Sequence, residues 1–574
     1  MKIKKGVYVK NIFGIENEYN AVLKKGGKFF EVTEECLPMW MIKQSTVYND
    51  NDGTCRSKLT PQNKRQLADA QKKLFFIHSS EVKDIWFGNG GRFYIDMGVI
   101  PEYCTPECSS VRELVGYDKA GEKLMYELFK AIATEEGELI LRKYNRNTPG
   151  NIMDSQIETC TGCHENYGIF IPGITKDSAG DYYENSLLEK YFFNKILNGE
   201  RYVMESLLSF LVTRQIFAGA GYLSVVGFSS PGSIGGKFLI SSRADFIQKT
   251  HNNVSTTDSR NIVCTKDKSL TYANCNYRRV HFSVGESNMS EVSNYLKIGT
   301  THLVLRMLNE EENEEFLLRY PKIKNPVVAI KIISADTMFK NKYELAKKYG
   351  SFDYLSAIDI QKHFLNAAAD FLARHGASKE ENRILESWGK VIDSLENDPA
   401  SLSDTLDYKI KFSLMDNYLK GHNCSWNEII TKEITVRGDK GEIVRRPMIE
   451  RLMAINVAYH DIGPNGLYNQ LIAKNKLKRI LSDSEINFKM FNPPARTRAR
   501  MRGEFIRKIV MDGLIDIKDF YARVGWERLG LPLIGDNRLD QGYCNIPDPI
   551  IYNQEKFGKL LEELKKIKES KNNG

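Results

Sequence analysis

The stretch NGGRFYIDMGVIPEY at residues 89–103 constrains the fold of this chain more than any other. Polar and apolar side chains alternate from Arg92 to Met97, which is the period of a β-strand. Arg92, Tyr94 and Asp96 therefore share one face, and apolar side chains on the other face anchor the strand to a core. Surface strands usually present threonine, lysine or serine to water, so this polar face indicates a functional site built on a sheet.

The order of the expected elements predicts an α+β fold with an antiparallel sheet. Strands are concentrated early in the chain and helices late, without the regular alternation of a doubly wound fold. Ser109 or Ser110 is the expected N-cap of the helix at 109–134. The expected strands are 7–20, 91–97, 138–144, 166–172, 237–241 and 279–284, and the expected helices are 62–74, 109–134, 200–218, 289–308, 357–375, 378–396 and 402–420.

The chain has 574 residues, which exceeds the usual size of one domain. We expect a catalytic domain over residues 1–478 and a small C-terminal domain over residues 479–574. Residues 21–88 are expected to form an inserted loop region that contains one helix. Long inserted loops in compact domains often act as lids.

The composition excludes some classes of function. Lys and Arg number 81 against 73 Asp and Glu, and a net charge of +8 is too small at this length to indicate nucleic acid. No apolar run approaches the roughly 18 residues of a membrane span. The N-terminus has no apolar stretch or cleavage site typical of a signal peptide. We therefore expect a cytoplasmic protein without a membrane partner.

Four cysteines and four arginines could have either a functional or a purely structural role. The cysteine pairs 104/108 and 160/163 have spacings that could hold zinc, but unligated reduced thiols are favoured. Arginines 496, 498, 500 and 502 form two rows about 200° apart on a helix, so they do not make one basic face. Structural ion pairs are favoured over contacts to phosphate or an acidic partner.

Four short segments present carboxylates near arginine and histidine. Carboxylates that face one another raise each other's pKa, and a hard divalent cation such as Mg²⁺ or Mn²⁺ removes that cost. No phosphate-binding P-loop or kinase glycine-rich loop is present. The combination predicts an enzyme with a nucleotide and a metal on a sheet. The candidate acidic and histidine residues are Glu16, Glu18, Glu102, Glu107, His164 and Glu165, and the candidate phosphate-binding residues are Arg92, Arg243, Arg278 and Arg279.

The motifs GIENEY, NGGRFYIDMG, PEYCT, YDKAGE, GCHENY, FLVTRQ, SSRADF, YRRVHF, AYHD and TRARMRGEF follow one another along the chain. In this order they resemble the family of ligases and depupylases that act on the prokaryotic ubiquitin-like protein, Pup. The resemblance extends from about residue 12 to residue 530. It implies a glutamine-synthetase-like carboxylate–amine ligase domain, with helices on a curved antiparallel sheet, and a small C-terminal domain.

The resemblance also implies residue roles, which match the chemistry expected above. ATP and Mg²⁺ are the implied cofactors. By motif, Glu16, Tyr94 and Glu102 correspond to Mg²⁺ ligands, Arg92, Thr105 and Trp526 to ATP contacts, and Asp96 to the catalytic base. On physical grounds we add Glu18, Glu165 and His164 to the metal site and Arg243 and Arg279 to the nucleotide site.

The implied reaction joins a glutamate carboxylate of a Pup-like small protein modifier to a lysine of a target protein through an acyl phosphate. The alternative is a depupylase or deamidase that hydrolyses the corresponding amide, and the long region 21–88 is closer to that branch. A non-catalytic scaffold is a third interpretation. GCHENY and TRARMRGEFI favour the ligase, whereas altered segments at 265–276 and 421–447 leave the modifier open. A proteasome is a possible further partner.

Overall fold

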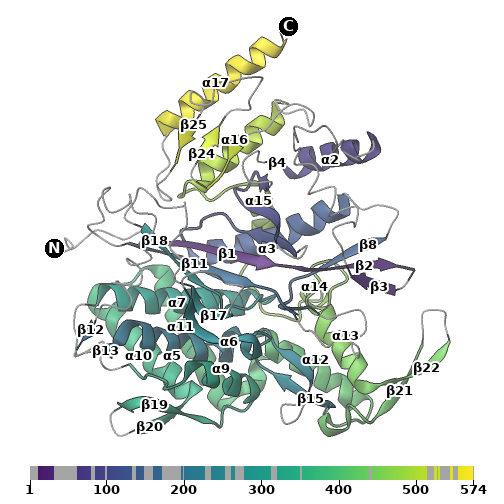
Figure 1. The fold of residues 1–574 in the computed structure, drawn as a ribbon, viewed down its shortest axis with the longest axis vertical. Helices are drawn as coiled ribbons and strands as arrows, with labels where there is room; N and C mark the ends of the chain where they lie inside the picture. The colour runs from purple at the N-terminus through teal and green to yellow at the C-terminus, as the bar shows by residue number, and fades with distance from the viewer. Residues whose placement is uncertain are drawn as a thin grey trace.

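The computed structural model describes residues 11–26, 28–31, 61–78, 84–96, 100–131, 137–147, 159–170, 196–197, 200–226, 234–252, 260–264, 277–311, 320–349, 352–437, 442–512, 523–526, 528–530, 543–546 and 554–572. Its centre is a nine-stranded sheet (Figure 1). The strand order is β16 (Lys249–Asn252), β17 (Asn261–Cys264), β18 (Tyr277–Phe282), β11 (Cys163–Phe170), β1 (Ile12–Glu18), β7 (Ile100–Cys104), β6 (Arg92–Asp96), β5 (Ile85–Phe87) and β4 (Phe76–His78).

Neighbouring strands of this main sheet are antiparallel, except that β16 and β17 are parallel. Smaller sheets are formed by β2 (Asn20–Lys25), β3 (Lys28–Glu31) and β8 (Glu138–Arg142), and by β23 (Arg523–Val524), β24 (Arg528–Gly530) and β25 (Tyr543–Asn545). The two-stranded pairs are β9 (Arg146–Asn147) with β10 (Thr159–Cys160), β12 (Ile196–Leu197) with β13 (Glu200–Arg201), β14 (Tyr222–Val226) with β15 (Ile234–Leu239), β19 (Lys342–Tyr349) with β20 (Phe352–Ser356), and β21 (Glu433–Arg437) with β22 (Ile443–Pro447).

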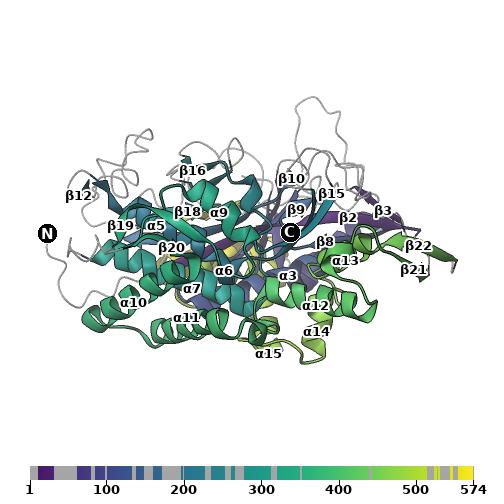
Figure 2. The same cartoon turned by 90° about the horizontal axis from the view of Figure 1, so that it is seen from below.

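Helices lie mainly on one side of the main sheet, as Figure 2 shows. The helices are α2 (Pro61–Leu74), α3 (Val111–Ala131), α5 (Tyr202–Thr213), α6 (Gln215–Ala218), α7 (Glu291–Glu310), α9 (Pro326–Ala335), α10 (Ala357–His375), α11 (Lys379–Asn397), α12 (Asp407–Gly421), α13 (Met448–Ala458), α14 (Leu467–Ala473), α15 (Asp483–Phe491), α16 (Ala499–Met511) and α17 (Gln554–Asn572). The expected α+β class with a largely antiparallel sheet is confirmed.

The main core fills the space between the sheet and these helices. Ile15, Phe93 and Tyr103 point into it from three adjacent strands and are almost fully buried. Leu114 and Leu124 approach from α3. Because side chains alternate along a strand, the intervening residues point to the opposite side of the sheet. We call that opposite side, which carries Glu16, Arg92, Glu102 and His164, the front face.

Local capping explains where several helices begin. Ser356 and Ser378 form capping boxes at the starts of α10 and α11. The Ser110 hydroxyl accepts a hydrogen bond from the Glu113 amide at 3.1 Å, which confirms Ser110 as the N-cap of α3. The other expected helices and strands also occur, with shifted ends. The expected helix at 200–218 is divided into α5 and α6 at Arg214.

The region 21–88 is more ordered than expected where the structure describes it. The expected helix is present as α2, but β4 and β5 also extend the main sheet at one edge. Ile77 of β4 and Trp86 of β5 belong to a second hydrophobic core with Met501, Phe505 and other residues of the C-terminal part. A domain boundary at residue 478 stays a prediction.

Within the part of the chain that the structure describes, every helix is too short or too polar to cross a lipid bilayer.

Candidate nucleotide and metal site

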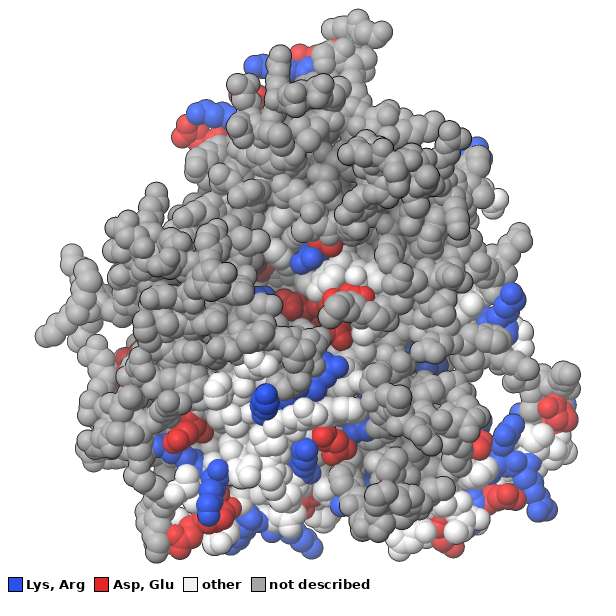
Figure 3. Space-filling view, viewed as in Figure 1, with Lys and Arg blue, Asp and Glu red and all other residues white. Residues whose placement is uncertain are grey.

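Strand register brings the polar residues of the front face into rows. In one row, Tyr94 of β6 lies opposite Glu102 of β7, which in turn lies opposite Glu18 of β1. The next row runs from Arg92 through Cys104 to Glu16 and ends at His164. Paired residues in a sheet have Cβ atoms about 4.5–5.5 Å apart, so charged groups in one row are immediate neighbours. Figure 3 shows acidic side chains gathered near the middle of the corresponding surface.

Three carboxylates form the first group. One oxygen from each of Glu18, Asp96 and Glu102 lies within 4.8 Å of the others. Burial raises the pKa of Glu102 well above its usual value, and the charges of Glu16 and Glu18 raise it further. Glu102 Oε1 is buried without a hydrogen-bond partner among the described residues. A divalent cation with oxygen ligands would satisfy all three carboxylates.

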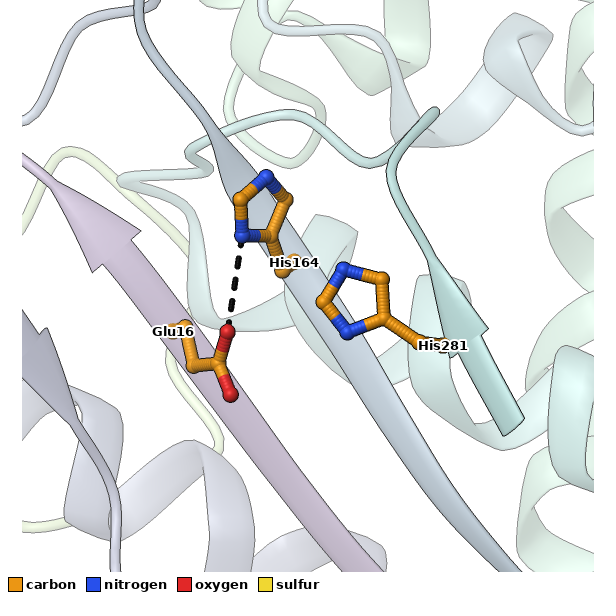
Figure 4. A group of neighbouring side chains, drawn as sticks. All are labelled: Glu16, His164 and His281. Atoms are coloured by element: carbon orange, nitrogen blue, oxygen red, sulfur yellow. Dashed lines mark ion pairs between the residues drawn. The ribbon is translucent and has the colours of Figure 1, made fainter. Parts of the chain in front are cut away.

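The second group is Glu16, His164 and His281 (Figure 4), whose ligand atoms also lie within 4.8 Å of one another. His164 Nδ1 is 3.4 Å from Glu16 Oε2, and Arg279 Nη1 is 3.4 Å from Glu16 Oε1. Burial alone would raise the pKa of Glu16. The hydrogen bond from His164 and the charges of His281 and Arg279 outweigh burial and hold that pKa well below its usual value. Glu16 is therefore ionised and available as a metal ligand.

A solvent-open cleft adjoins the second group. Its lining includes Gly14, Thr105, Arg279, Arg498 and Trp526, so β1, β18 and the C-terminal part all contribute. The Thr105 hydroxyl accepts a hydrogen bond from the Ile15 amide at 3.0 Å, which ties β1 to the turn after β7. The cleft and the acidic groups lie side by side and together offer the polar donors and the charge that a nucleotide with a metal ion needs.

Arg92 is oriented by neighbours on three sides. Its Nε donates to Asp84 Oδ2 at 2.6 Å. Its guanidinium lies 4.2 Å from the centre of the Tyr94 ring and 5.9 Å from that of Trp86. Trp86 in turn contacts Trp526 edge to face, with ring centres 4.9 Å apart. The expected phosphate-binding arginine and the expected nucleotide-binding tryptophan are thus connected through Trp86.

Two expected site residues lie elsewhere, and both expectations were wrong. Glu165 points to the helical side of β11, because adjacent residues of a strand face opposite ways, and its carboxylate pairs with the Arg214 guanidinium in the core. Arg243 is 2% exposed and donates to the backbone carbonyl groups of Thr161 and Ser283. Neither side chain reaches the front-face groups.

The expected structural ion pairs of the TRARMRGEF segment are confirmed. Arg498 Nε donates to Glu107 Oε1 at 2.7 Å, and the Arg502 guanidinium pairs with the second oxygen of the same carboxylate. Arg500 instead pairs with Glu504 one turn along its own helix at 2.8 Å. Glu107 is therefore a structural anchor for α16 and not a ligand in either acidic group.

Sequence reasoning missed His281, Asn166 and Asp84. His281 lies two residues after Arg279 on the same strand, so the alternation rule could have placed it on the front face. Asn166 Nδ2 donates to Glu16 Oε1 at 3.2 Å, and the same alternation relates it to His164. Asp84 had no such signal, because its approach to Arg92 depends on the pairing of β5 with β6.

Comparison with known proteins decides the family. The family model for Pup-ligase protein matches residues 11–529. This chain belongs to the Pup-ligase protein family. The matched segment contains both front-face groups and Trp526, and it ends before β25 and α17.

Relatives and solved structures agree with membership of the Pup-ligase family. The Pup–protein ligase of Nakamurella multipartita is 32% identical over 489 residues, which cover 84% of this chain and 90% of that protein. The Pup–protein ligase of Paenarthrobacter aurescens is 32% identical over 434 residues, covering 74% and 80%. A crystal structure of Pup with its ligase PafA matches with a TM-score of 0.68 and 24% identity, covering 97% and 92%. PafA in complex with ADP matches with a TM-score of 0.64 and 24% identity, covering 89% and 95%.

Proposed function

We propose that this Pup-ligase family member is an ATP- and Mg²⁺-dependent ligase. It joins a glutamate side-chain carboxylate of a Pup-like modifier to a lysine amine of a target protein. The observation that carries the proposal is the pair of acidic groups on one sheet face, beside Arg92, Arg279 and the cleft that Thr105 and Trp526 line. A ligase that activates a carboxylate with ATP requires this combination of divalent cation, phosphate contact and nucleotide pocket.

The residues present fit Mg²⁺. Glu18, Asp96 and Glu102 supply oxygen donors within reach of one ion, and the unpartnered Glu102 Oε1 provides a further reason for one to bind there. Glu16, His164 and His281 could hold a second ion, with Tyr94 beside the first. When bound, Mg²⁺ would neutralise the negative charge that develops on the phosphates during transfer.

The proposed chemistry has two displacements. First, a modifier carboxylate oxygen attacks the terminal phosphorus of ATP, an acyl–oxygen–phosphorus linkage forms, and ADP leaves. Then a lysine nitrogen attacks the acyl carbon, the amide forms, and phosphate leaves. Arg92 and Arg279 bind and orient phosphate oxygens during both steps.

Asp96 is the proposed base. Lysine has a reference pKa of about 10.4 and is protonated at neutral pH, so it must lose a proton to attack. Asp96 ends β6 on the front face, next to Glu18 and Glu102, where it can accept that proton. The same position could activate a water molecule, which is the chemistry of the depupylase alternative.

The deciding assay uses purified protein, ATP, Mg²⁺, a Pup-like protein ending in glutamate and a lysine-bearing acceptor. A ligase yields ADP and a conjugate with the mass of both proteins minus water. A depupylase instead releases the modifier from a preformed conjugate without net consumption of ATP. Absence of ADP and conjugate, with efficient cleavage, would overturn the ligase proposal. A cytoplasmic location and a proteasome partner remain predictions.

A further inference from the structure

The buried carboxylate of Asp84 contacts Arg92, but neither the sequence motifs nor the proposed chemistry assigns it a role in nucleotide binding. Asp84 immediately precedes β5 and is 3% exposed. Its Oδ2 accepts a hydrogen bond from Arg92 Nε at 2.6 Å, and the partners' side chains are 4% and 21% exposed. A charge-assisted contact of this length is among the stronger hydrogen bonds in proteins. Asp84 therefore holds the guanidinium of Arg92, which is the residue of β6 that the proposed function assigns to ATP binding.

The contact fixes the guanidinium plane and leaves its phosphate-binding edge available. Nε is engaged by Asp84, and the Tyr94 ring covers one face at 4.2 Å. Within the described ranges, no hydrogen bond uses either Nη atom of Arg92. A planar guanidinium that is held at one nitrogen and one face has little rotational freedom left. The side chain is 21% exposed, so the two Nη groups are left to bind an anion.

A buried ion pair is weak evidence for stability, because removing two charges from water costs about as much as their attraction returns. Burial raises the pKa of Asp84 to about 6, although the charge and hydrogen bond of Arg92 oppose that rise. Asp84 also partly neutralises Arg92 and so reduces its long-range attraction for phosphate. The geometry therefore favours an orienting role over a stabilising one.

We propose that Asp84 is a positioning residue that orients Arg92 for the phosphates of ATP. This inference rests on the proposed function, because it takes Arg92 as a phosphate contact. It extends the nucleotide site into the region 21–88, to the start of β5, the strand next to the sheet edge. Asp84 itself touches neither nucleotide nor metal in this arrangement.

Binding of ADP, measured by calorimetry with the full chain and Mg²⁺, tests the proposal without the modifier. Asp84→Ala should weaken ADP binding about tenfold, as expected for loss of an orienting charge-assisted bond. In the conjugation assay it should raise KM for ATP by a similar factor and change kcat by less than about threefold. Asp84→Asn keeps an acceptor oxygen and should recover most of the lost affinity.

A double-mutant cycle separates orientation from general damage. In an Arg92→Ala background, Asp84→Ala should cause no further loss of ADP affinity. Additive losses, or an unchanged affinity in the single variant, would overturn the proposal. The matched control is Glu311→Ala, which removes a buried carboxylate paired with Arg374 at 2.7 Å on the helical side. It should leave ADP affinity unchanged.

The two proposals fail in different ways. Wild-type protein that binds ADP but forms no conjugate with any acceptor contradicts ligase activity, and the cycle still decides the role of Asp84. Conjugation that proceeds with equal KM for ATP in wild type and Asp84→Ala contradicts the role of Asp84 alone. Loss of one partner of a buried ion pair lowers the melting temperature, so the melting temperature of each variant must be shown to lie well above the assay temperature.

Discussion

At the scale of single residues, the proposed function assigns phosphate binding and proton transfer to different residues of the front face. Asp96 lies at the end of β6, whereas Arg92 lies at its beginning, so the two ends of one strand have different proposed tasks. Asp96→Asn preserves shape and hydrogen bonding but removes the base. We expect conjugation to slow about 10²- to 10⁴-fold, the usual contribution of general base catalysis.

ADP binding by Asp96→Asn, measured by calorimetry with Mg²⁺, should change far less than its turnover, because Glu18, Glu102 and the side-chain oxygen of the new asparagine still supply ligands for the cation. Full activity in this variant would show that another group accepts the lysine proton.

Asp84 gives the nucleotide site a specific pH dependence. Its pKa is raised to about 6, so the carboxyl gains a proton, and Arg92 loses its charged partner, as the pH falls through 6. We expect wild-type ADP affinity to decrease between pH 7.5 and pH 5 relative to Asp84→Asn. Titration of the ADP phosphate affects both proteins equally, so the ratio of their dissociation constants isolates Asp84. A ratio that is constant with pH would contradict this assignment.

At the scale of elements, Glu107 attaches α16 to the turn between β7 and α3. Burial would raise the pKa of Glu107, but Arg502 and Arg498 hold it below the usual value. Glu107→Ala leaves two buried arginines without their carboxylate. Breaking such a pair costs about 3–5 kcal/mol of unfolding free energy.

Hydrogen exchange by mass spectrometry should report this loss as faster exchange in α16. Arg500→Ala in the same helix removes only a partly exposed pair with Glu504 and serves as the control. Equal protection of α16 in Glu107→Ala and wild type would mean that the second core alone holds the helix.

The sequence predicted elements better than the contacts between them. Strand alternation was sufficient to place Arg92, Tyr94 and Asp96 on one face, because the period is local. The same rule forbids His164 and Glu165 from facing one site, and it was not applied when both residues were added to the metal site on physical grounds. Which side chains line up across neighbouring strands depends on the strand register, and no local sequence pattern specifies that register. The prediction for Arg243 failed because an arginine can bind either a phosphate or backbone carbonyl groups, and the residue type alone does not decide between them.

Short edge elements were also beyond prediction. The strands β4 and β5 have three residues each, and their order comes from pairing with β6 and from the second core. Local propensity is a weak guide where pairing and burial decide the strand. For that reason the region 21–88 was expected to be mostly loop, and Asp84 and Trp86 were not recognised as neighbours of the site.

At the scale of the whole molecule, the cleft is completed by distant parts of the chain. Residues of β1, β7 and β18 line it together with Arg498 and Trp526. A ligand bound there stabilises the folded state of all these parts. At one hundred times its dissociation constant, ADP with Mg²⁺ should add about 2.7 kcal/mol to the free energy of unfolding.

Thermal denaturation should therefore show one transition that ADP and Mg²⁺ move upward by a few degrees. Addition of EDTA should reverse most of the shift, because Glu18, Asp96 and Glu102 repel the phosphates when no cation is bound. A shift that persists undiminished in EDTA would contradict a metal-dependent site.

Trp86 and Arg502 share one core, and the hydrogen bond from Arg502 Nε to the Gly90 carbonyl spans 412 positions of sequence. During synthesis at about 5–20 residues per second, ~20–80 s separate the appearance of these partners from the ribosome. Throughout that interval α16, which packs against β4 and β5, is absent from this edge of the sheet. The cleft that Arg498 and Trp526 help to line can therefore form only after residues 498–526 have been synthesised.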